Sequence, residues 1–255
     1  MSEALERAEE TAFRTMAQSA GLSVLEVAGA TCIAHPAAAN VTLLNRVVAL
    51  GLGGPVGDAE LDEIDAFFRS HATRYAVPLA PFAPRELEAR LLERGFTVGY
   101  PWMRFERDVV APPSAPTQLR IVEVDGGGDF ATVVNEVFGL PPQAARVFDD
   151  LPRLERWHCF VAYDGDTPAA TGALCVHDDV GWLGCAGTVP AQRGKGAQSA
   201  LLATRVTRAA ELGLRALTTE TGERSPDRPA SSYRNILRAG FTEAYLRPNL
   251  LSPEP

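Results

Sequence analysis

The 255-residue sequence lacks any apolar run of the roughly 18 residues that a membrane-spanning helix needs. It also lacks a secretion signal, because its opening stretch, MSEALERAEETAFRTM, is charged and helically spaced instead of basic and then apolar. We therefore expect a cytoplasmic protein with no membrane partner.

Positive charge is scarce. The chain has 24 Lys and Arg residues against 32 Asp and Glu, which gives a net charge of −8. Binding nucleic acid over a whole surface requires a basic face that neutralises phosphates, so we expect no nucleic-acid partner. Any site for an anion must be local.

Paired cysteines and metal-ligand spacings are absent as well. The four cysteines form no Cys-x-x-Cys pair, and Cys159, Cys175 and Cys185 lie in apolar runs. The four histidines show no spacing typical of metal ligands. We expect buried, reduced thiols and no metal site.

Residues 109–118, VVAPPSAPTQ, are the one stretch with the composition of a linker, because its prolines prevent a helix or a central strand. We place domains at 1–110 and 119–255, joined by a Pro-rich linker at 111–118. The domain ahead of the linker is expected to carry no cofactor site.

The second half predicts the element order β-α-α-β-β-β-loop-α-β-α-β. Three consecutive strands joined by short polar turns indicate an antiparallel meander. The expected strands are 119–124, 157–166, 167–176, 181–190, 214–221 and 241–251, and the expected helices are 129–139, 141–154, 199–213 and 231–241.

The first half has the pattern of a worn copy of the second. LERGFT at 92–97 nearly repeats LRAGFT at 237–242, about one domain length further on. We interpret this as duplication. We expect a strand leading into a glycine turn at 42–55, a strand interrupted by Pro78 at 73–82 and a final strand at 97–109, with helices at 59–72 and 84–96.

Residues 193–198, RGKGAQ, combine two cations and two glycines with no acid, directly before a helix. Unpaired N–H groups at a helix start favour an anion, and the glycines let the backbone curve around it. A Walker loop is excluded because GxxxxGK[ST] is absent, and a dinucleotide turn conflicts with the antiparallel meander. A phosphate site is favoured over a solvated loop.

The second half resembles the GNAT superfamily of acyl-CoA-dependent N-acyltransferases. Residues 193–198 match the family signature [RQ]xxGx[GA] except at Gln198, and 231–241, SSYRNILRAGF, match its helix ending in Gly-Phe. The order of elements agrees over 119–250. The resemblance implies an α/β (α+β) fold with two GNAT-like domains in tandem, each a mixed, mainly antiparallel sheet flanked by helices, the first being degenerate.

The resemblance also implies acetyl-CoA as co-substrate, without a metal. The strand before the loop would offer backbone groups to the pantetheine arm, the loop would hold the pyrophosphate, and the later helix would contact the cofactor arm. An ordinary surface role for Ser232 and Asn235 is an equal alternative. The cofactor-binding candidates are Thr188, Val189, Arg193, Gly194, Lys195, Gly196, Ala197, Gln198, Ser199, Ser232 and Asn235.

The catalytic groups are harder to place. The family often has a carboxylate base on the strand before the loop, but residues 181–190 contain none. Glu220 on the next strand is the chosen candidate, ahead of Asp178 and Asp179. Ile236 stands where the family usually has the tyrosine that protonates the leaving thiolate. Tyr233, one helical turn earlier, is therefore the candidate acid. The alternative is transfer by proximity alone, with the two reactants held in line.

These patterns predict an N-acetyltransferase that moves an acetyl group from acetyl-CoA to a primary amine of a small molecule or peptide, as a monomer or homodimer. The alternative is a non-catalytic CoA-binding or structural protein with two lobes. A nicotinamide dehydrogenase conflicts with the meander.

Overall fold

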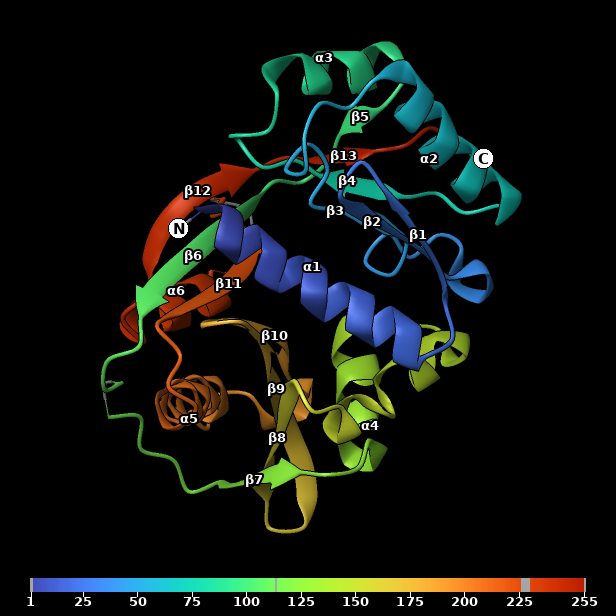
Figure 1. The fold of residues 1–255 in the computed structure, drawn as a ribbon. Coiled ribbons are helices and arrows are strands. Elements are labelled where there is room, and N and C mark those ends of the chain that lie inside the picture. The colour runs from blue at the N-terminus through green and yellow to red at the C-terminus, as the bar shows by residue number, and fades with distance from the viewer. Residues whose placement is uncertain (1, 113, 226–229, 255) are drawn as a thin grey trace. The chain divides into compact units, whose positions relative to one another are not determined.

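The computed structural model describes residues 2–112, 114–225 and 230–254. The chain forms two compact units (Figure 1). The first unit is Met1–Trp102 together with Tyr245–Pro255, and the second is Met103–Ala244. Neither unit contains a helix, among the described residues, that is long and apolar enough to cross a membrane.

The first unit contains a six-stranded sheet of order β1-β2-β3-β4-β13-β5. Helix α1 covers one face of this sheet, and α2 and α3 cover the other (Figure 1). Its elements are α1 (Ser2–Ser19), β1 (Ser23–Val27), β2 (Ala30–Ala34), η1 (Pro36–Ala38), β3 (Arg46–Val48), α2 (Asp58–Ser70), β4 (Ala76–Pro78), α3 (Arg85–Glu93), β5 (Thr97–Val98) and β13 (Asn249–Leu251).

The second unit contains a seven-stranded sheet of order β12-β6-β11-β10-β9-β8-β7, with α4 and α5 on opposite faces (Figure 1). Its elements are β6 (Trp102–Asp108), β7 (Arg120–Val124), α4 (Gly128–Phe138), η2 (Pro142–Phe148), η3 (Leu151–Arg153), β8 (Trp157–Asp164), β9 (Thr167–His177), β10 (Val180–Thr188), η4 (Pro190–Gln192), α5 (Ala197–Glu211), β11 (Ala216–Gly222), α6 (Ser231–Arg238) and β12 (Thr242–Arg247).

The meander and the helix after the loop form as their sequence patterns predict. β8, β9 and β10 pair antiparallel in chain order. Helix α5 buries Leu202, Val206 and Ala209, which recur at helical spacing and share a core cluster with Leu183 and Leu217. The fold is a mixed α/β fold with two mixed sheets flanked by helices.

The repeated Gly-Phe motif has the same geometry in both halves. Gly95 and Gly240 follow α3 and α6 with φ of 87° and 84°. In each case the glycine N–H donates to the carbonyl three residues back, and the following phenylalanine, Phe96 or Phe241, is buried. The left-handed glycine that ends the helix explains why the motif needs Gly at this place.

Each half gives its final strand to the other sheet. The predicted strand at 97–109 is instead two strands, β5 and β6, separated at Pro101, and the one at 241–251 is split into β12 and β13 at Pro248. Proline has no N–H for a ladder and ends the pairing. β6 lies between β11 and β12, and β13 lies between β4 and β5, so the two exchanges correspond.

Two further expectations need correction. Residues 141–154 form the short 3-10 helices η2 and η3 instead of an α-helix. Pro152 has no N–H to continue an i to i+4 ladder, so one continuous helix across 141–154 is not possible. The hairpin of β1 and β2 was not predicted at all.

The compact units divide at 102/103 and 244/245 because of the strand exchange. The ranges 1–110 and 119–255 remain a proposal for the two duplicated segments, and 111–118 for the stretch that joins them. Pro113 of that stretch lies outside the described residues.

Candidate active site

Two parallel strands part at the centre of the second sheet. β10 pairs with β11 from Val180↔Ala216 to Leu183↔Thr219, and the Thr219 hydroxyl donates to the Leu183 carbonyl at 2.8 Å. β10 then continues to Thr188 along β9, and the register with β11 extends no further within the described strands. The opening that follows, which we call the wedge, leaves main-chain groups of β10 facing a gap.

A bulge in β10 lies at the inner end of the wedge. Gly184 is paired with Ala173 and Gly187 with Thr171, so Cys185 and Ala186 stand opposite Gly172 alone. Cys185 has φ 49°, a left-handed conformation that is rare for a residue with a side chain. The Thr171 hydroxyl donates to the Cys185 carbonyl at 3.0 Å and holds this turn of the chain.

The RGKGAQ loop follows β10 and leads into α5. Gly194 and Gly196 have φ of 83° and 79°, which only glycine adopts without strain, and Gly196 is the last residue before the helix. The first turn of α5 contains no acidic residue. The first N–H groups of the helix and its dipole therefore meet no competing carboxylate from the helix itself.

The charge of the loop is partly neutralised from outside it. Lys195 Nζ lies 2.5 Å from Asp164 Oδ2, at the end of β8, and 2.7 Å from Gln192 Oε1. The sequence argument had found no carboxylate near the loop, because Asp164 is distant in the chain. Arg193 is exposed and makes no ion pair with any described residue. The loop is also braced by the Thr117 hydroxyl, which donates to the Lys195 carbonyl at 2.9 Å.

Gln198, the residue that departs from the family signature, points inward. Its amide Nε2 donates to Thr188 Oγ1 at 3.1 Å and to the Thr171 carbonyl at 3.4 Å. Gln198 thus ties the first turn of α5 to β9 and to the end of β10. Ala197 is buried and Ser199 half-buried in the same turn.

Thr188 and Val189 differ in what they can offer. Thr188 is the last residue of β10 and lies at the mouth of the wedge. Val189 donates its N–H to the Ala169 carbonyl at 2.9 Å and accepts from Gln192 N–H at 2.8 Å. Both main-chain groups of Val189 are therefore engaged, so Thr188 is the stronger candidate for a ligand contact.

Ser232 and Asn235 lie on α6, which packs against α5 and β11. Ser232 is exposed and Asn235 half-buried. Neither side chain makes a hydrogen bond with a described residue. Their position on the helix beside α5 leaves both the ligand role and the ordinary surface role open.

Glu220 is the first residue of β11 beyond its last pair with β10, so it stands where the wedge opens. Its Oε2 lies 3.5 Å from Nη2 of Arg104, which is fully buried on β6. The two groups form a buried ion pair, and a carboxylate at this place is a candidate proton acceptor. Sequence reasoning missed Arg104, because β6 comes from the first half.

The alternative bases lie elsewhere. Asp178 and Asp179 form the turn before β10, at the opposite end of the strand from the loop. Asp179 is bonded by the Arg215 guanidinium at 2.6 Å, and this bond lowers the pKa of its carboxyl. Neither carboxylate faces the wedge.

Tyr233 is packed and already bonded. It is 3% exposed, its ring lies edge-on to Phe105, and its hydroxyl donates to Glu243 Oε1 at 2.5 Å. Burial and this hydrogen bond raise the pKa of Tyr233 to about 12. A phenol with such a pKa is a poor proton donor near neutral pH. Ile236, at the family's tyrosine position, is buried in the same cluster.

The first unit has a different arrangement where α2 begins. The Glu60 carboxylate accepts from the Gly57 N–H at 2.8 Å, and Asp58 is paired with Arg90 at 2.9 Å and with Arg94. The helix start is therefore occupied by carboxylates of its own chain. Such charges oppose a pyrophosphate.

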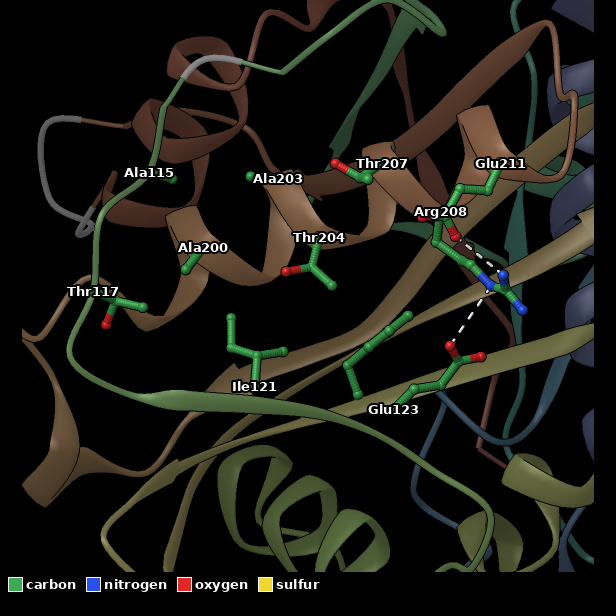
Figure 2. Close-up of a pocket in the computed structure, with 11 residues that line it drawn as sticks. Ala115, Thr117, Ile121, Glu123, Ala200, Ala203, Thr204, Thr207, Arg208 and Glu211 are labelled. Carbon is green, nitrogen blue, oxygen red and sulfur yellow. Dashed lines mark hydrogen bonds and ion pairs between the residues drawn. The ribbon is translucent and has the colours of Figure 1, made fainter.

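A groove of about 530 Å³ lies apart from these residues, between α5 and the edge strand β7 (Figure 2). Ala200, Ala203 and Thr204 line it from the helix. Its charged end is closed by Arg208, which contacts Glu123 at 3.6 Å and Glu211 at 3.1 Å. It shares no residue with the predicted site. No group of described His, Cys, Asp or Glu residues is placed to hold a metal ion.

Comparison with known proteins gives one family match, and it lies within the second unit. Residues 133–230 match the model described as the acetyltransferase (GNAT) family. No curated protein sequence matches the chain. The matched range contains β8 to β11, α5 and the loop, which are the elements that form the wedge.

Solved structures of similar fold cover nearly the whole chain. A GCN5-related N-acetyltransferase from Kribbella flavida is 20% identical over 96% of each chain, with a TM-score of 0.67. One from Sphaerobacter thermophilus is 15% identical over 98% of this chain and 92% of its own, with a TM-score of 0.63. A tandem GNAT protein from the clavulanic acid biosynthesis pathway is 16% identical over 88% of this chain and 78% of its own, with a TM-score of 0.59. These similarities show the fold.

Proposed function

We propose that the protein is an acyl-CoA-dependent N-acetyltransferase, because residues 133–230 match the model of the acetyltransferase (GNAT) family. It transfers an acetyl group from acetyl-CoA to a primary amine of a small molecule or peptide. The observation that carries the proposal is the wedge between β10 and β11, which opens beside a glycine loop and an acid-free helix start. This arrangement provides main-chain donors for an extended arm next to a site for an anion.

The loop residues 193–198 and Ser199 hold the pyrophosphate in this proposal. Arg193 contributes a free positive charge, and the two glycines aim the N–H groups at the phosphates. Thr188, at the mouth of the wedge, receives the pantetheine arm, with Val189 as the less suitable neighbour. Ser232 and Asn235 contact the arm from α6.

Glu220 acts as the base. The amine nitrogen attacks the thioester carbonyl carbon, the carbon–sulfur bond breaks, and the proton lost by nitrogen ends on sulfur. Glu220 accepts that proton directly or through water and returns it through solvent to the leaving thiolate, so that free CoA thiol is released and the carboxylate is restored; Arg104 is the ion-pair partner of the carboxylate. We assign no proton transfer to Tyr233, because its hydroxyl is bonded to Glu243 and its pKa is high.

Binding is tested by calorimetric titration with acetyl-CoA. The intact protein is expected to bind in the micromolar range, and a variant with Arg193→Glu and Gly196→Asp is expected to lose binding. Gly213→Asp is the matched control, because Gly213 is an exposed glycine with φ 72° beyond the other end of α5. No binding by the intact protein would overturn the proposal.

The alternative is a protein that binds CoA without catalysis. Ile236 at the family's tyrosine position favours it. Release of free thiol from acetyl-CoA in the presence of a panel of amines separates the two, because only the enzyme releases thiol in an amine-dependent way.

The first half binds no CoA in our proposal, because Asp58 and Glu60 occupy the start of α2. It serves the enzyme by supplying β6, and with it Arg104. The protein works as a monomer or a homodimer.

A further inference from the structure

A buried arginine meets the bulge of β10 from the side of α5. Arg205 is 1% exposed, and its Nε donates to the Leu201 carbonyl at 3.0 Å while Nη1 reaches the Ala173 carbonyl at 3.3 Å. Ala173 is the partner of Gly184, where the bulge begins. The guanidinium therefore contacts the strand directly opposite the bulge.

The neighbouring strand is shaped to accept this side chain. A Cβ on Gly172 would lie only 2.7 Å from Cζ of Arg205. Gly172 is the residue that faces Cys185 and Ala186 across the bulge. Glycine inside a strand weakens it, and here its absent side chain makes room for the guanidinium.

The charge of Arg205 has no acidic partner among the described residues; its acceptors are carbonyls. Burial lowers the pKa of Arg205 to about 10, so the group remains charged near neutral pH. Burying an unpaired charge costs free energy, and an apolar residue at this position would avoid that cost. The arginine must therefore do something that an apolar residue cannot.

Gln198 also bonds β9, and it does so nearer to the end of β10. It lies seven residues before Arg205, on the same face of α5, and bonds the Thr171 carbonyl and the Thr188 hydroxyl. Thr171 and Ala173 flank Gly172, so the two α5 side chains bracket the bulge. Thr171 completes the arrangement through its bond to the Cys185 carbonyl.

We propose that Arg205 is a positioning residue that fixes the bulge of β10 and so the direction of the main-chain groups facing the wedge, with Gln198 fixing the outer end of the same strand. Arg205 acts at the inner end, where the strands part, and Gln198 acts next to the pyrophosphate loop. The kinetic consequence rests on the proposed function: Arg205 governs the transfer step, and Gln198 governs the binding of acetyl-CoA.

The first test needs no ligand. Hydrogen exchange of amides 184–188 is compared in the intact protein and in the Arg205→Met and Arg208→Met variants. Arg208 is the matched control, since it lies on α5 but pairs with Glu123 and Glu211. Arg205→Met is expected to speed exchange of these amides about tenfold, as lost hydrogen bonds would, while β8 and the rest of α5 keep their protection. Unchanged protection of residues 184–188, or loss of protection throughout the unit, would refute the proposal.

The second test fills the space that the guanidinium occupies and leaves Arg205 itself unchanged. Gly172→Ala is expected to speed the same exchange, because the new Cβ displaces the guanidinium. In the Arg205→Met background the added Gly172→Ala change should have little further effect, since the group it displaces is gone. Additive effects of the two changes would contradict the assignment.

The third test measures steady-state kinetics. Arg205→Met is expected to lower kcat about tenfold with KM for acetyl-CoA nearly unchanged, and Gln198→Leu to raise that KM about tenfold with kcat nearly unchanged. Arg205→Lys should recover part of kcat, because the lysine ammonium can donate to some of the carbonyls that the guanidinium bonds. If both variants lowered kcat by the same factor and also raised KM by the same factor, the division of roles between Arg205 and Gln198 would be refuted. If the intact protein shows no transfer, the proposed function fails, and the exchange tests alone decide the role of Arg205.

Discussion

Glu220 and Arg104 form a pair whose members come from different halves of the chain. The arginine is fully buried on β6 and the carboxylate opens the wedge on β11. Neither residue type is unusual by itself. Their juxtaposition depends on strand pairing, so the chemistry of the site is set by a long-range contact that no local pattern contains.

Glu220→Gln is expected to lower kcat about a hundredfold or more while leaving the affinity for acetyl-CoA within a few-fold, because a general base contributes to the transition state. Steady-state kinetics and calorimetry on the same preparation measure this. Arg104→Met is the companion variant: it removes the buried ion-pair partner of the Glu220 carboxylate, so kcat should fall as well. If the Glu220→Gln variant kept the full kcat, Glu220 would be excluded as the general base.

Lys195 is the single lysine of the chain, which makes its environment easy to follow chemically. Acetyl-CoA is expected to slow labelling of Lys195 by an amine-directed reagent about tenfold at saturation, as bound ligand would at near-complete occupancy. Mass spectrometry of the modified peptide measures the rate. S-acetylpantetheine, which has no pyrophosphate, should protect little, and equal protection by both compounds would place the pyrophosphate elsewhere.

At the scale of elements, the two helix starts show how one fold position can serve opposite purposes. The start of α5 is acid-free and follows two left-handed glycines, whereas the start of α2 has Asp58 and a bond from Gly57 to Glu60. The two helix ends are instead alike, since α3 and α6 both close on a left-handed glycine. The glycine that ends the helix is shared by the two halves and has a structural role. The charges at the helix start differ, and that is where a ligand would bind.

Gly95→Ala and Gly240→Ala are each expected to lower the free energy of unfolding by about 1–2 kcal/mol, because a side chain is strained in the left-handed conformation. Chemical denaturation measures the change. Gly128→Ala is the control of opposite sign: this glycine begins α4 with open space around it, so alanine there should stabilise by about 0.4–1 kcal/mol. The same sign for all three would contradict the assignment.

The whole molecule is joined by the two exchanged strands. Removing residues 1–118 takes β6 from between β11 and β12, and removing the C-terminal strand takes β13 from between β4 and β5. The Pro-rich stretch is therefore a connection in the chain but not a place where the fold can be cut.

A fragment of residues 119–255 is expected to show no cooperative thermal transition and no binding of acetyl-CoA, since its sheet lacks β6, the interior strand that joins β12 to β11. A fragment of residues 103–247 retains all of β12 and nearly all of β6 and is expected to unfold cooperatively. Calorimetric melting of both fragments measures this. Cooperative melting of the 119–255 fragment would show that β6 is dispensable.

Stability is expected to fall as the pH rises above about 9. Burial raises the pKa of Cys32 and Cys185 from 9.0 to about 12, and burial with the Glu243 bond raises that of Tyr233 from 10.0 to about 12. As the pH rises, these groups lose their protons in the unfolded chain before they do in the folded protein. The free energy of unfolding therefore falls by about 1.4 kcal/mol per pH unit for each such group. Denaturant titrations from pH 8 to about 11 measure the slope; a flat profile would mean that these groups ionise freely in the folded state.

Sequence patterns predicted what is local and missed what is distant. The period of α5, the meander of β8 to β10 and the glycine loop were all readable, because each depends on neighbours in the chain. The strand exchange was not, since a strand's alternation tells which face is buried but not which strand lies beside it. Arg205 lies in a helix whose buried residues recur at helical spacing, and nothing in that local pattern shows that its guanidinium meets Gly172 on β9.

The exchanged strands also set an order of events during synthesis. β13, at residues 249–251, is synthesised after every strand of the second sheet, yet it lies inside the first sheet between β4 and β5. The sheet of the amino-terminal unit therefore stays incomplete until residues 249–251 have been made, while β6 is already available when the later strands of the second sheet are made. A newly made chain thus has all the strands of its second sheet before it has all the strands of its first.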